Sequence, residues 1–184
     1  MNQRLRQILI FTVTLILSGV LVWLGFRYQH QLENLGSAGL LGLFIASVLG
    51  NATVFIPVPS FIVACAAAPA YGWVAAGVVS GVGATLGETT GWLAGYGGSA
   101  IIPHGKWYDR LTDFMRRHGM IGIFLLALIP NPVFDVAGAI SGALKMPLWQ
   151  FWVSAGAGKV IRYTIGAYAC GLPWLLEYFN RFGK

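Results

Sequence analysis

Four charged side chains interrupt long apolar stretches of the sequence and are the first candidates for chemistry. Glu88 and Asp135 are acidic, whereas Lys159 and Arg162 are basic. A charge inside a membrane-spanning segment is costly, so each of the four is a functional candidate by default. Lys159 and Arg162 are three residues apart and therefore share one face of a helix. Two cations, together with free backbone N–H groups where broken helices begin, would suit a phosphate headgroup.

Each of these charges also has a purely structural interpretation. Glu88 and Lys159 could form a buried ion pair that only fixes helix packing. Asp135 could simply cap the helix that leaves a Pro-Asn-Pro bend, and we count Asn131 of that bend with the candidate binding residues. In a functional site, the carboxylates would balance the two cations, and a protonatable carboxylate could couple movement to protons.

The amino-acid composition indicates that these charges belong to a membrane protein. Of the 184 residues, 57% are apolar and 10% are charged, whereas a soluble domain carries about 25% charged residues. So few charges cannot cover the surface of a water-soluble domain of this size. The net charge of +6 suits basic loops that face anionic lipid headgroups, and the apolar runs argue against nucleic-acid binding. We therefore expect an all-α integral membrane protein.

Other chemistry finds little support in the sequence. The two cysteines, Cys65 and Cys170, lie in apolar segments, and we expect them only to pack, with no redox role. No cluster of histidine, cysteine and carboxylate has the spacing of a metal site. The sequence contains no HExxH, GxSxG or phosphate-loop motif. We expect no metal, no cofactor and no enzymatic activity.

Apolar runs and prolines predict the elements that must position the charges. Ile8–Phe26 carries no charge and is long enough for a retained first transmembrane helix. The runs 39–68 and 120–146 are each broken by two prolines. Such a pair ends a helix, and broken backbone survives in lipid only where protein buries it or it lines a cavity. We therefore predict two re-entrant hairpins, whose bends hold Pro57, Pro59, Pro130 and Pro132.

Three further segments complete the predicted architecture. Tyr71–Gly98 and Leu148–Gly171 can each span the membrane once. In the first of them, glycine recurs at every fourth residue from Gly83 to Gly95, a spacing that lets helices approach closely and is also compatible with a homo-oligomer. Pro103–His118 is rich in Lys and Arg, so we expect an amphipathic surface helix on the cytoplasmic side, together with the N-terminus.

The two broken segments repeat each other in sequence. IPVPSFIVACAAA, which begins at Ile56, matches IPNPVFDVAGAIS, which begins at Ile129, at seven of thirteen positions. With a two-residue gap, the alignment then pairs Gly87 with Gly158, Glu88 with Lys159, and Gly95 with Gly166. With the N-terminus inside, the first hairpin enters from outside and the second from the cytoplasm. This inverted repeat is typical of secondary transporters, whose site lies near the bilayer midplane.

The motifs together resemble the DedA superfamily, also called the VTT domain or SNARE-associated family. The resemblance covers roughly residues 36–171. It rests on IPVPS, on GVGATLGETTGWLAGYGGS, on RRHGMIGIFLLALIPNPVFDVAGAISG and on GKVIRY, with a phenylalanine seven residues before the last of these. We accordingly divide the chain into an N-terminal helix and connection (1–35), the VTT-like domain (36–171) and a tail (172–184).

The resemblance implies a function as well as a fold. Members of this family are described as membrane proteins with re-entrant hairpins, and several are linked to moving lipids across bilayers. In bacteria the implicated lipids include undecaprenyl phosphate and phosphatidylethanolamine, and eukaryotic relatives resemble phospholipid scramblases. Carried over by position, it points to Pro57, Pro59, Glu88, Pro130, Pro132, Asp135, Lys159 and Arg162. Many bacterial members have an acid where this chain has Asn51.

We therefore expect a flippase-like or scramblase-like translocase that moves an anionic phospholipid or a polyprenyl phosphate between leaflets. Lys159 and Arg162 would hold the phosphate. We expect it in the bacterial plasma (inner) membrane with a cytoplasmic N-terminus. Two alternatives remain open: a proton- or ion-coupled transporter of a small soluble solute, and a non-transporting membrane scaffold.

Overall fold

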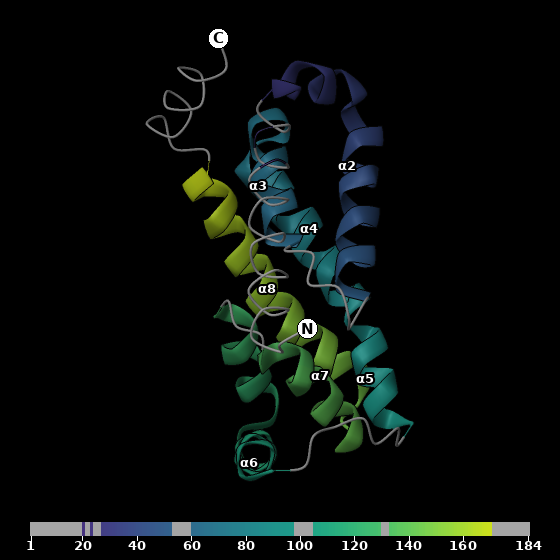
Figure 1. Ribbon diagram of the computed structural model, residues 1–184, viewed down its shortest axis with the longest axis vertical. Coiled ribbons are helices and arrows are strands. Elements are labelled where there is room, and N and C mark those ends of the chain that lie inside the picture. Colours follow the sequence, from purple (N-terminus) through teal and green to yellow (C-terminus); the bar gives the residue numbers. More distant parts are fainter. Residues whose placement is uncertain are drawn as a thin grey trace, which may run out of the picture.

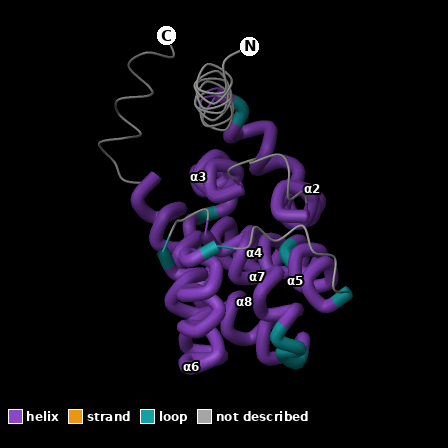
Figure 2. Tube along the Cα trace, turned by 60° about the horizontal axis from the view of Figure 1, so that its bottom comes forward, coloured by secondary structure: helices purple, strands orange, loops and turns teal. Residues whose placement is uncertain are grey.

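The computed structural model describes residues 20, 23, 27–52, 60–97, 105–129 and 133–170. All regular structure in these ranges is helical, which confirms the expected all-α class (Figures 1 and 2). The helices are α2 (Gln29–Ala52), α3 (Ser60–Tyr71), α4 (Trp73–Gly87), α5 (Thr89–Tyr96), α6 (Lys106–Leu128), α7 (Val133–Ala143) and α8 (Leu148–Cys170). Most of the predicted first helix, the tail, Asn131 and the four bend prolines lie outside the described residues.

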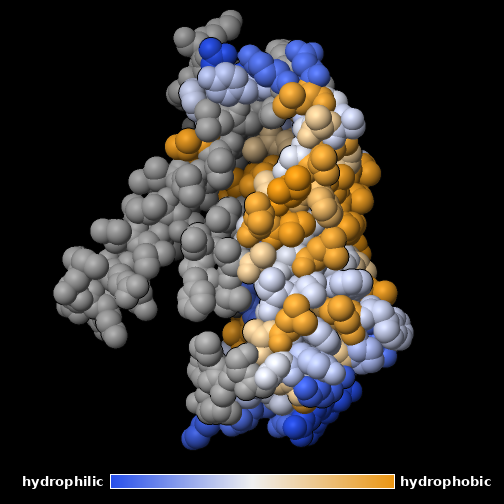
Figure 3. Space-filling view, turned by 90° about the vertical axis from the view of Figure 1, so that its right-hand side faces the viewer, coloured by the Kyte–Doolittle hydropathy of each residue, from blue (hydrophilic) through white to orange (hydrophobic). Residues whose placement is uncertain are grey.

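One described helix meets the length and hydropathy expected of a membrane span. It is the part of α2 from Asn34 to Ala52, with a mean hydropathy of 1.6 over its most apolar window. Leu41, Ile45 and Leu49 recur every fourth residue along it and are exposed, so they form one apolar face. Figure 3 shows hydrophobic side chains gathered over the middle of the molecule between more hydrophilic ends. This distribution fits a chain whose middle contacts lipid.

Buried apolar side chains divide the helices into two lobes. The first lobe contains α2, α3, α4 and the C-terminal half of α8. These helices pack through buried residues such as Leu43 of α2, Ala76 of α4 and Ala167 of α8. The second lobe contains α5, α6, α7 and the N-terminal half of α8, with Ile123 and Phe151 among its buried residues. Figure 1 shows α8 running along both lobes. The midpoint of α8 therefore lies where the lobes meet.

The segment from Tyr71 to Gly98, expected to span as one helix, is kinked at Glu88. The helix α4 ends just before this residue and α5 begins just after it. The Thr90 hydroxyl donates hydrogen bonds to the carbonyls of Gly87 and Ala52, both at 3.0 Å. A hydroxyl that bonds a carbonyl of the preceding turn bends a helix. Because one of the two acceptors belongs to α2, tertiary packing contributes to the kink.

The predicted glycine positions bring helices into close contact within the chain. A Cβ built on Gly83 or Gly87 would clash with backbone carbonyls of α2, and one on Gly95 would lie 1.8 Å from the Ala139 carbonyl oxygen of α7. The close approach of α4 and α8 depends on Gly77 and Gly81, whose added Cβ atoms would lie 2.4 and 2.7 Å from the backbone of α8. Small residues thus let these backbones touch.

A glycine kink lies just before each of the two broken segments, 39–68 and 120–146. Gly36 within α2 has φ 50° and ψ −125°, and Gly119 within α6 has φ 51° and ψ −122°. Positive φ is a conformation that glycine adopts without a steric penalty. Before Gly119, α6 buries Leu111 and Met115 while its arginines stay exposed. The predicted amphipathic surface helix is therefore present.

The two cysteines are bonded, which corrects the expectation that they only pack. Cys65 of α3 and Cys170 at the end of α8 form a disulfide, with their Cα atoms 5.4 Å apart. They are separated by 105 residues in sequence. Their proximity follows from the packing of α3 against α8, which the sequence pattern alone did not reveal.

Candidate functional site

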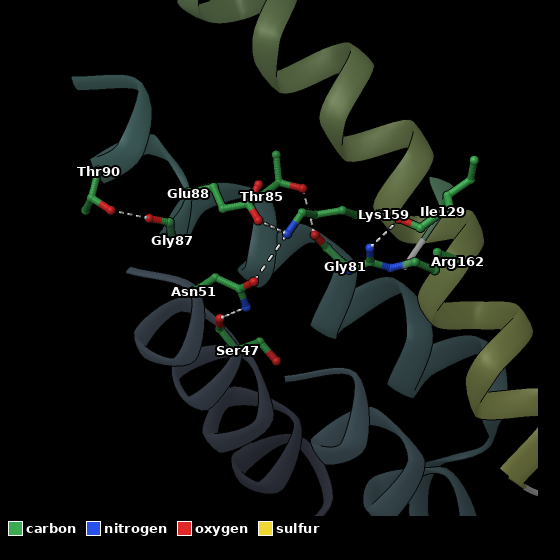
Figure 4. Close-up of polar contacts among 10 residues, drawn as sticks. All are labelled: Ser47, Asn51, Gly81, Thr85, Gly87, Glu88, Thr90, Ile129, Lys159 and Arg162. Carbon is green, nitrogen blue, oxygen red and sulfur yellow. Dashed lines mark hydrogen bonds and ion pairs between the residues drawn. The ribbon is translucent and has the colours of Figure 1, made fainter. Parts of the chain in front are cut away.

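The Glu88–Lys159 ion pair lies at the junction of the two lobes (Figure 4). The ammonium group of Lys159 donates a hydrogen bond to Glu88 Oε1 and another, at 3.2 Å, to Asn51 Oδ1. It also lies 5.1 Å from the ring centroid of Phe134, within reach of a cation–π contact. Lys159 is 1% exposed and Glu88 is 7% exposed. The two residues that the repeat alignment pairs are thus in direct contact.

Local structure explains how these side chains reach each other. Glu88 occupies the kink between α4 and α5, whereas Lys159 lies on α8 beside Gly158. A Cβ on Gly158 would lie 2.7 Å from the Phe124 carbonyl oxygen of α6, so this glycine lets α8 pack tightly at the level of the ion pair. Lys159 is almost completely buried, so its three ammonium donors depend mainly on partners within the protein.

Asn51 is a site residue that the sequence analysis did not select. It lies in the last turn of α2, where its amide nitrogen donates to the Ser47 carbonyl at 2.8 Å while its oxygen accepts from Lys159. The sequence signals were a polar residue at the end of an apolar run and its place at a position where many bacterial members of the resembled family have an acid. Glu88 Oε2, by contrast, is buried without a hydrogen-bond partner in the described part of the chain. Within the described residues, this oxygen is therefore an unused acceptor.

Arg162 lies one turn beyond Lys159 and has a different environment. Its NH1 group donates to the Ile129 carbonyl, just past the end of α6, at 3.3 Å (Figure 4). Its Nε atom is buried and has no hydrogen-bond partner among the described residues. None of the carboxylates described by the structure forms an ion pair with it. Its guanidinium carbon also lies 5.2 Å from the ring centroid of Tyr163. Within the described part of the chain, Arg162 therefore has no ion-pair partner, and its Nε donor is unused.

Asp135 completes the set of predicted charges near a small pocket. It lies in the first turn of α7, where a carboxylate suits the positive end of the helix dipole. It makes no ion pair with Lys159 or Arg162 in the structure. The pocket lies between the kink, the end of α2 and the start of α7, and its lining consists of Asn51, Glu88, Gly91, Phe134, Asp135 and Gly138. The four predicted charges therefore gather around one region, although only Glu88 and Lys159 pair.

Comparison with known proteins identifies related sequences. A family model described as the VTT domain matches residues 58–172. The chain is 43% identical over 42 residues to Vacuole membrane protein KMS2 of Arabidopsis thaliana, covering 23% of this chain and 10% of that protein. It is 42% identical over 53 residues to the Vacuole membrane protein 1 homolog of Dictyostelium discoideum, covering 29% and 13%.

Human Vacuole membrane protein 1 is 37% identical to this chain over 51 residues, which is 28% of this chain and 13% of that protein. The alignments thus span only about a tenth of these curated relatives. No solved structure matches the chain. The VTT domain model, however, covers more than half of the chain and includes the kink, α7 and nearly all of the site. The chain therefore belongs to the VTT domain family of membrane proteins, also known as the DedA or SNARE-associated family.

Proposed function

We propose that this membrane protein is a flippase-like or scramblase-like translocase, which moves an anionic phospholipid or a polyprenyl phosphate such as undecaprenyl phosphate between leaflets. The observation that carries the proposal is the buried, unused Nε donor of Arg162, which forms no ion pair within the described residues and lies one turn from the Glu88–Lys159 pair. Charge-assisted hydrogen bonds to guanidinium are strong and suit phosphate. The internally neutral Glu88–Lys159 pair adds a second cation that a phosphate could recruit.

The partners of Lys159 suggest how a headgroup would be admitted and released. A phosphate that bonds Arg162 could draw the Lys159 ammonium away from Glu88, while Asn51 keeps one hydrogen bond to that ammonium. Glu88 would then lose its ionic partner, and Asp135 lies across the same pocket. Either carboxylate could take a proton at this step, which is how protons would enter the cycle. The reaction is transport and not catalysis.

We also propose that the VTT domain is an inverted repeat of two re-entrant hairpins, with α2, α3 and α4–α5 related to α6, α7 and α8. Equivalent close contacts support it. Gly87 faces the Val48 carbonyl of α2, and its aligned partner Gly158 faces the Phe124 carbonyl of α6. Each glycine thus packs against the first helix of its own repeat.

A second pair of contacts supports the same symmetry across the repeats. Gly95 on α5 faces Ala139 of α7, whereas its aligned partner Gly166 on α8 faces the ring of Phe61 on α3. Each of these glycines packs against the second helix of the opposite repeat. The matching dihedral angles of Gly36 and Gly119 add a third correspondence. In such an architecture, the site lies near the midplane, where Glu88 and Lys159 meet.

The proposal includes an orientation. On the resemblance to bacterial members, we place the protein in the bacterial plasma membrane with a cytoplasmic N-terminus. The exposed basic side chains of the first half of α6, which are Lys106, Arg110, Arg116 and Arg117, would then face the cytoplasm.

Leaflet exchange in liposomes tests the proposed function. Purified protein would be reconstituted with fluorescent phosphatidylethanolamine, phosphatidylglycerol or a polyprenyl phosphate, and exchange would be scored by quenching of the outer leaflet. Arg162→Ala should slow exchange of the anionic lipids by about tenfold or more, the effect of losing one or two charged hydrogen bonds. Arg117→Ala, which removes an exposed arginine of α6, is the matched control and should stay close to wild type.

The outcomes separate the three candidate functions. Normal exchange by folded Arg162→Ala protein would remove the proposed headgroup site. Absence of exchange for every lipid, with and without a pH gradient, would reject the translocase and favour a small-solute carrier or a scaffold. A requirement for the pH gradient would show that protons drive the movement.

A further inference from the structure

The disulfide lies at one end of the first lobe. Cys65 is buried in α3, at 2% exposure, and Cys170 is the last residue of α8. Within the first hairpin, α3 returns alongside α2 until Tyr71 contacts Gly39, and the turn to α4 follows at Gly72. The α3–α4 turn and the end of α8 are therefore at the same end of the molecule, which is the upper end in Figure 1.

Aromatic packing holds the same two helices together. The Phe61 ring of α3 lies against Gly166 of α8, where an added Cβ would be 1.9 Å from it. The rings of Phe61 and Tyr163 meet edge to face, with centroids 5.9 Å apart. Because Tyr163 follows Arg162 directly, the bonded pair of helices includes the part of α8 that carries the site. The chain has two cysteines in all, so the second hairpin has no such covalent link.

The opposite end of the molecule carries the other chemical signal of orientation. The basic first half of α6 lies at the lower end in Figure 1, far from the end of α8. Segments rich in Lys and Arg remain on the cytoplasmic side, whereas disulfides form and persist in oxidising compartments such as the periplasm. A cytoplasmic α6 and an oxidising environment at Cys170 require the same orientation. The two signals are independent because one rests on charge and the other on thiol chemistry.

We propose that the α3–α4 turn and the end of α8 face an oxidising compartment, where the Cys65–Cys170 disulfide ties the first hairpin to the helix that carries Lys159 and Arg162. In its formation, the two thiols give up two protons and two electrons to a disulfide oxidant of that compartment, which is reduced to two thiols. The disulfide holds α3 against α8. The pocket, whose lining comes from α2, the kink, α5 and α7, can open without breaking it. None of this depends on the identity of the cargo.

Trapping the thiols in cells tests the tie on the wild-type protein. Cells would be acid-quenched, denatured and treated with a maleimide-linked polymer that adds mass to each free thiol. We expect no mass shift without reductant and two additions after reduction. Two additions without prior reduction would show that the disulfide is absent in the cell and would overturn the proposal. This readout requires neither a variant nor transport activity.

Reporter cysteines test the orientation. In a C65S/C170S background, Trp73→Cys places a thiol on an exposed residue beside the α3–α4 turn, and Arg117→Cys places one on the exposed face of α6. A membrane-impermeant maleimide applied to intact spheroplasts should label only the first, and permeabilisation should be needed for the second. Labelling is normalised to that of denatured protein. The reverse pattern, or equal labelling in intact spheroplasts, would overturn the orientation.

Reduction of the purified protein tests whether the tie constrains the fold. A link across 105 residues restricts the unfolded chain strongly, so reductant should lower the melting temperature of wild type by roughly 5 to 15 °C. The C65S/C170S protein should have the melting temperature of reduced wild type, and adding reductant should not change it. An unchanged melting temperature on full reduction would show that the bond ties nothing together.

Discussion

Lys159 and Arg162 are neighbours on one helix, yet the structure gives them different roles. Lys159 is surrounded by acceptors and an aromatic ring, so its charge is compensated within the protein. Arg162 has a buried donor without a partner in the described part of the chain, and its NH1 group donates to a backbone carbonyl beyond the end of α6. Removing charge from the first should therefore mainly affect folding, and removing charge from the second should mainly affect binding.

The stability of the ion pair gives a prediction for single and double variants. Lys159→Met should lower the free energy of unfolding by about 3 to 5 kcal/mol, because it leaves Glu88 buried without a cation. The E88L/K159M double variant removes both charges and should recover most of that loss. Thermal unfolding in detergent, followed by the loss of the monodisperse peak in size-exclusion chromatography, measures both.

The double variant also separates transport from scaffolding. If the pair only fixes packing, E88L/K159M protein should retain wild-type function. If Lys159 takes part in headgroup binding, the double variant should fold but exchange lipid more slowly than wild type. If the double variant is no more stable than Lys159→Met, the unpaired Glu88 carboxylate is not the main cause of the lost stability.

Residue types identified part of the site from sequence, for a physical reason. A charge in an apolar run is conspicuous because lipid and protein interiors exclude it, so Glu88, Asp135, Lys159 and Arg162 could be selected in advance. Asn51 could not, because an uncharged amide near a helix end is common and its contact with Lys159 is 108 residues distant in sequence. The functional roles of all these residues stay predictions.

At the scale of elements, glycine positions determine how near the helices lie. The residues Gly156 and Gly158 are two positions apart on α8 but face different surroundings. A Cβ on Gly158 would lie 2.7 Å from both the Ala127 side chain and the Phe124 carbonyl oxygen, whereas one on Gly156 would lie 3.7 Å from Thr85. Only Gly158 lacks room for a side chain, so substituting each glycine in turn gives a matched comparison.

Gly158→Ala should destabilise the protein by about 1 to 3 kcal/mol, because the added Cβ has no room and forces α6 away from α8 next to the ion pair. Gly156→Ala should leave stability unchanged or raise it by up to about 1 kcal/mol, since alanine favours the helix and has room. Melting temperatures of the two purified variants provide the measurement. Equal tolerance of both substitutions would show that α6 and α8 do not approach as closely as described.

The order of the elements was predictable, and their bends only in part. Proline spacing and apolar runs predicted two broken segments, a basic surface helix and a final long helix, because these features are local in the chain. The kink at Glu88 was missed, since one of the two hydrogen bonds that the Thr90 hydroxyl donates there reaches Ala52 of another helix. The re-entrant course of the hairpins remains a prediction, because the residues of both bends lie outside those described.

At the scale of the whole molecule, the two halves of the sequence do not correspond to the two lobes. The first half contributes α5 to the second lobe, and the second half contributes the end of α8 to the first lobe. Each half alone would leave one partner of the Glu88–Lys159 pair buried without the other. The lobes therefore form only when both halves of the chain are present.

This interlocking predicts that the protein assembles from two pieces. Fragments 1–100 and 101–184, cut between α5 and α6, should copurify through a tag on either one when they are co-expressed. Because Cys65 and Cys170 lie on different fragments, a non-reducing gel should show them covalently joined, and the Cys65→Ser variant should copurify without that joined band.

Each fragment expressed alone should accumulate poorly, since its glycine-lined faces and its buried charge lack partners. Stable, monodisperse fragments that do not bind each other would instead show two independent units, and the shared site between them would have to be abandoned. Copurification, with a joined band that Cys65→Ser removes, would establish in one experiment that α8 packs against the first half of the chain.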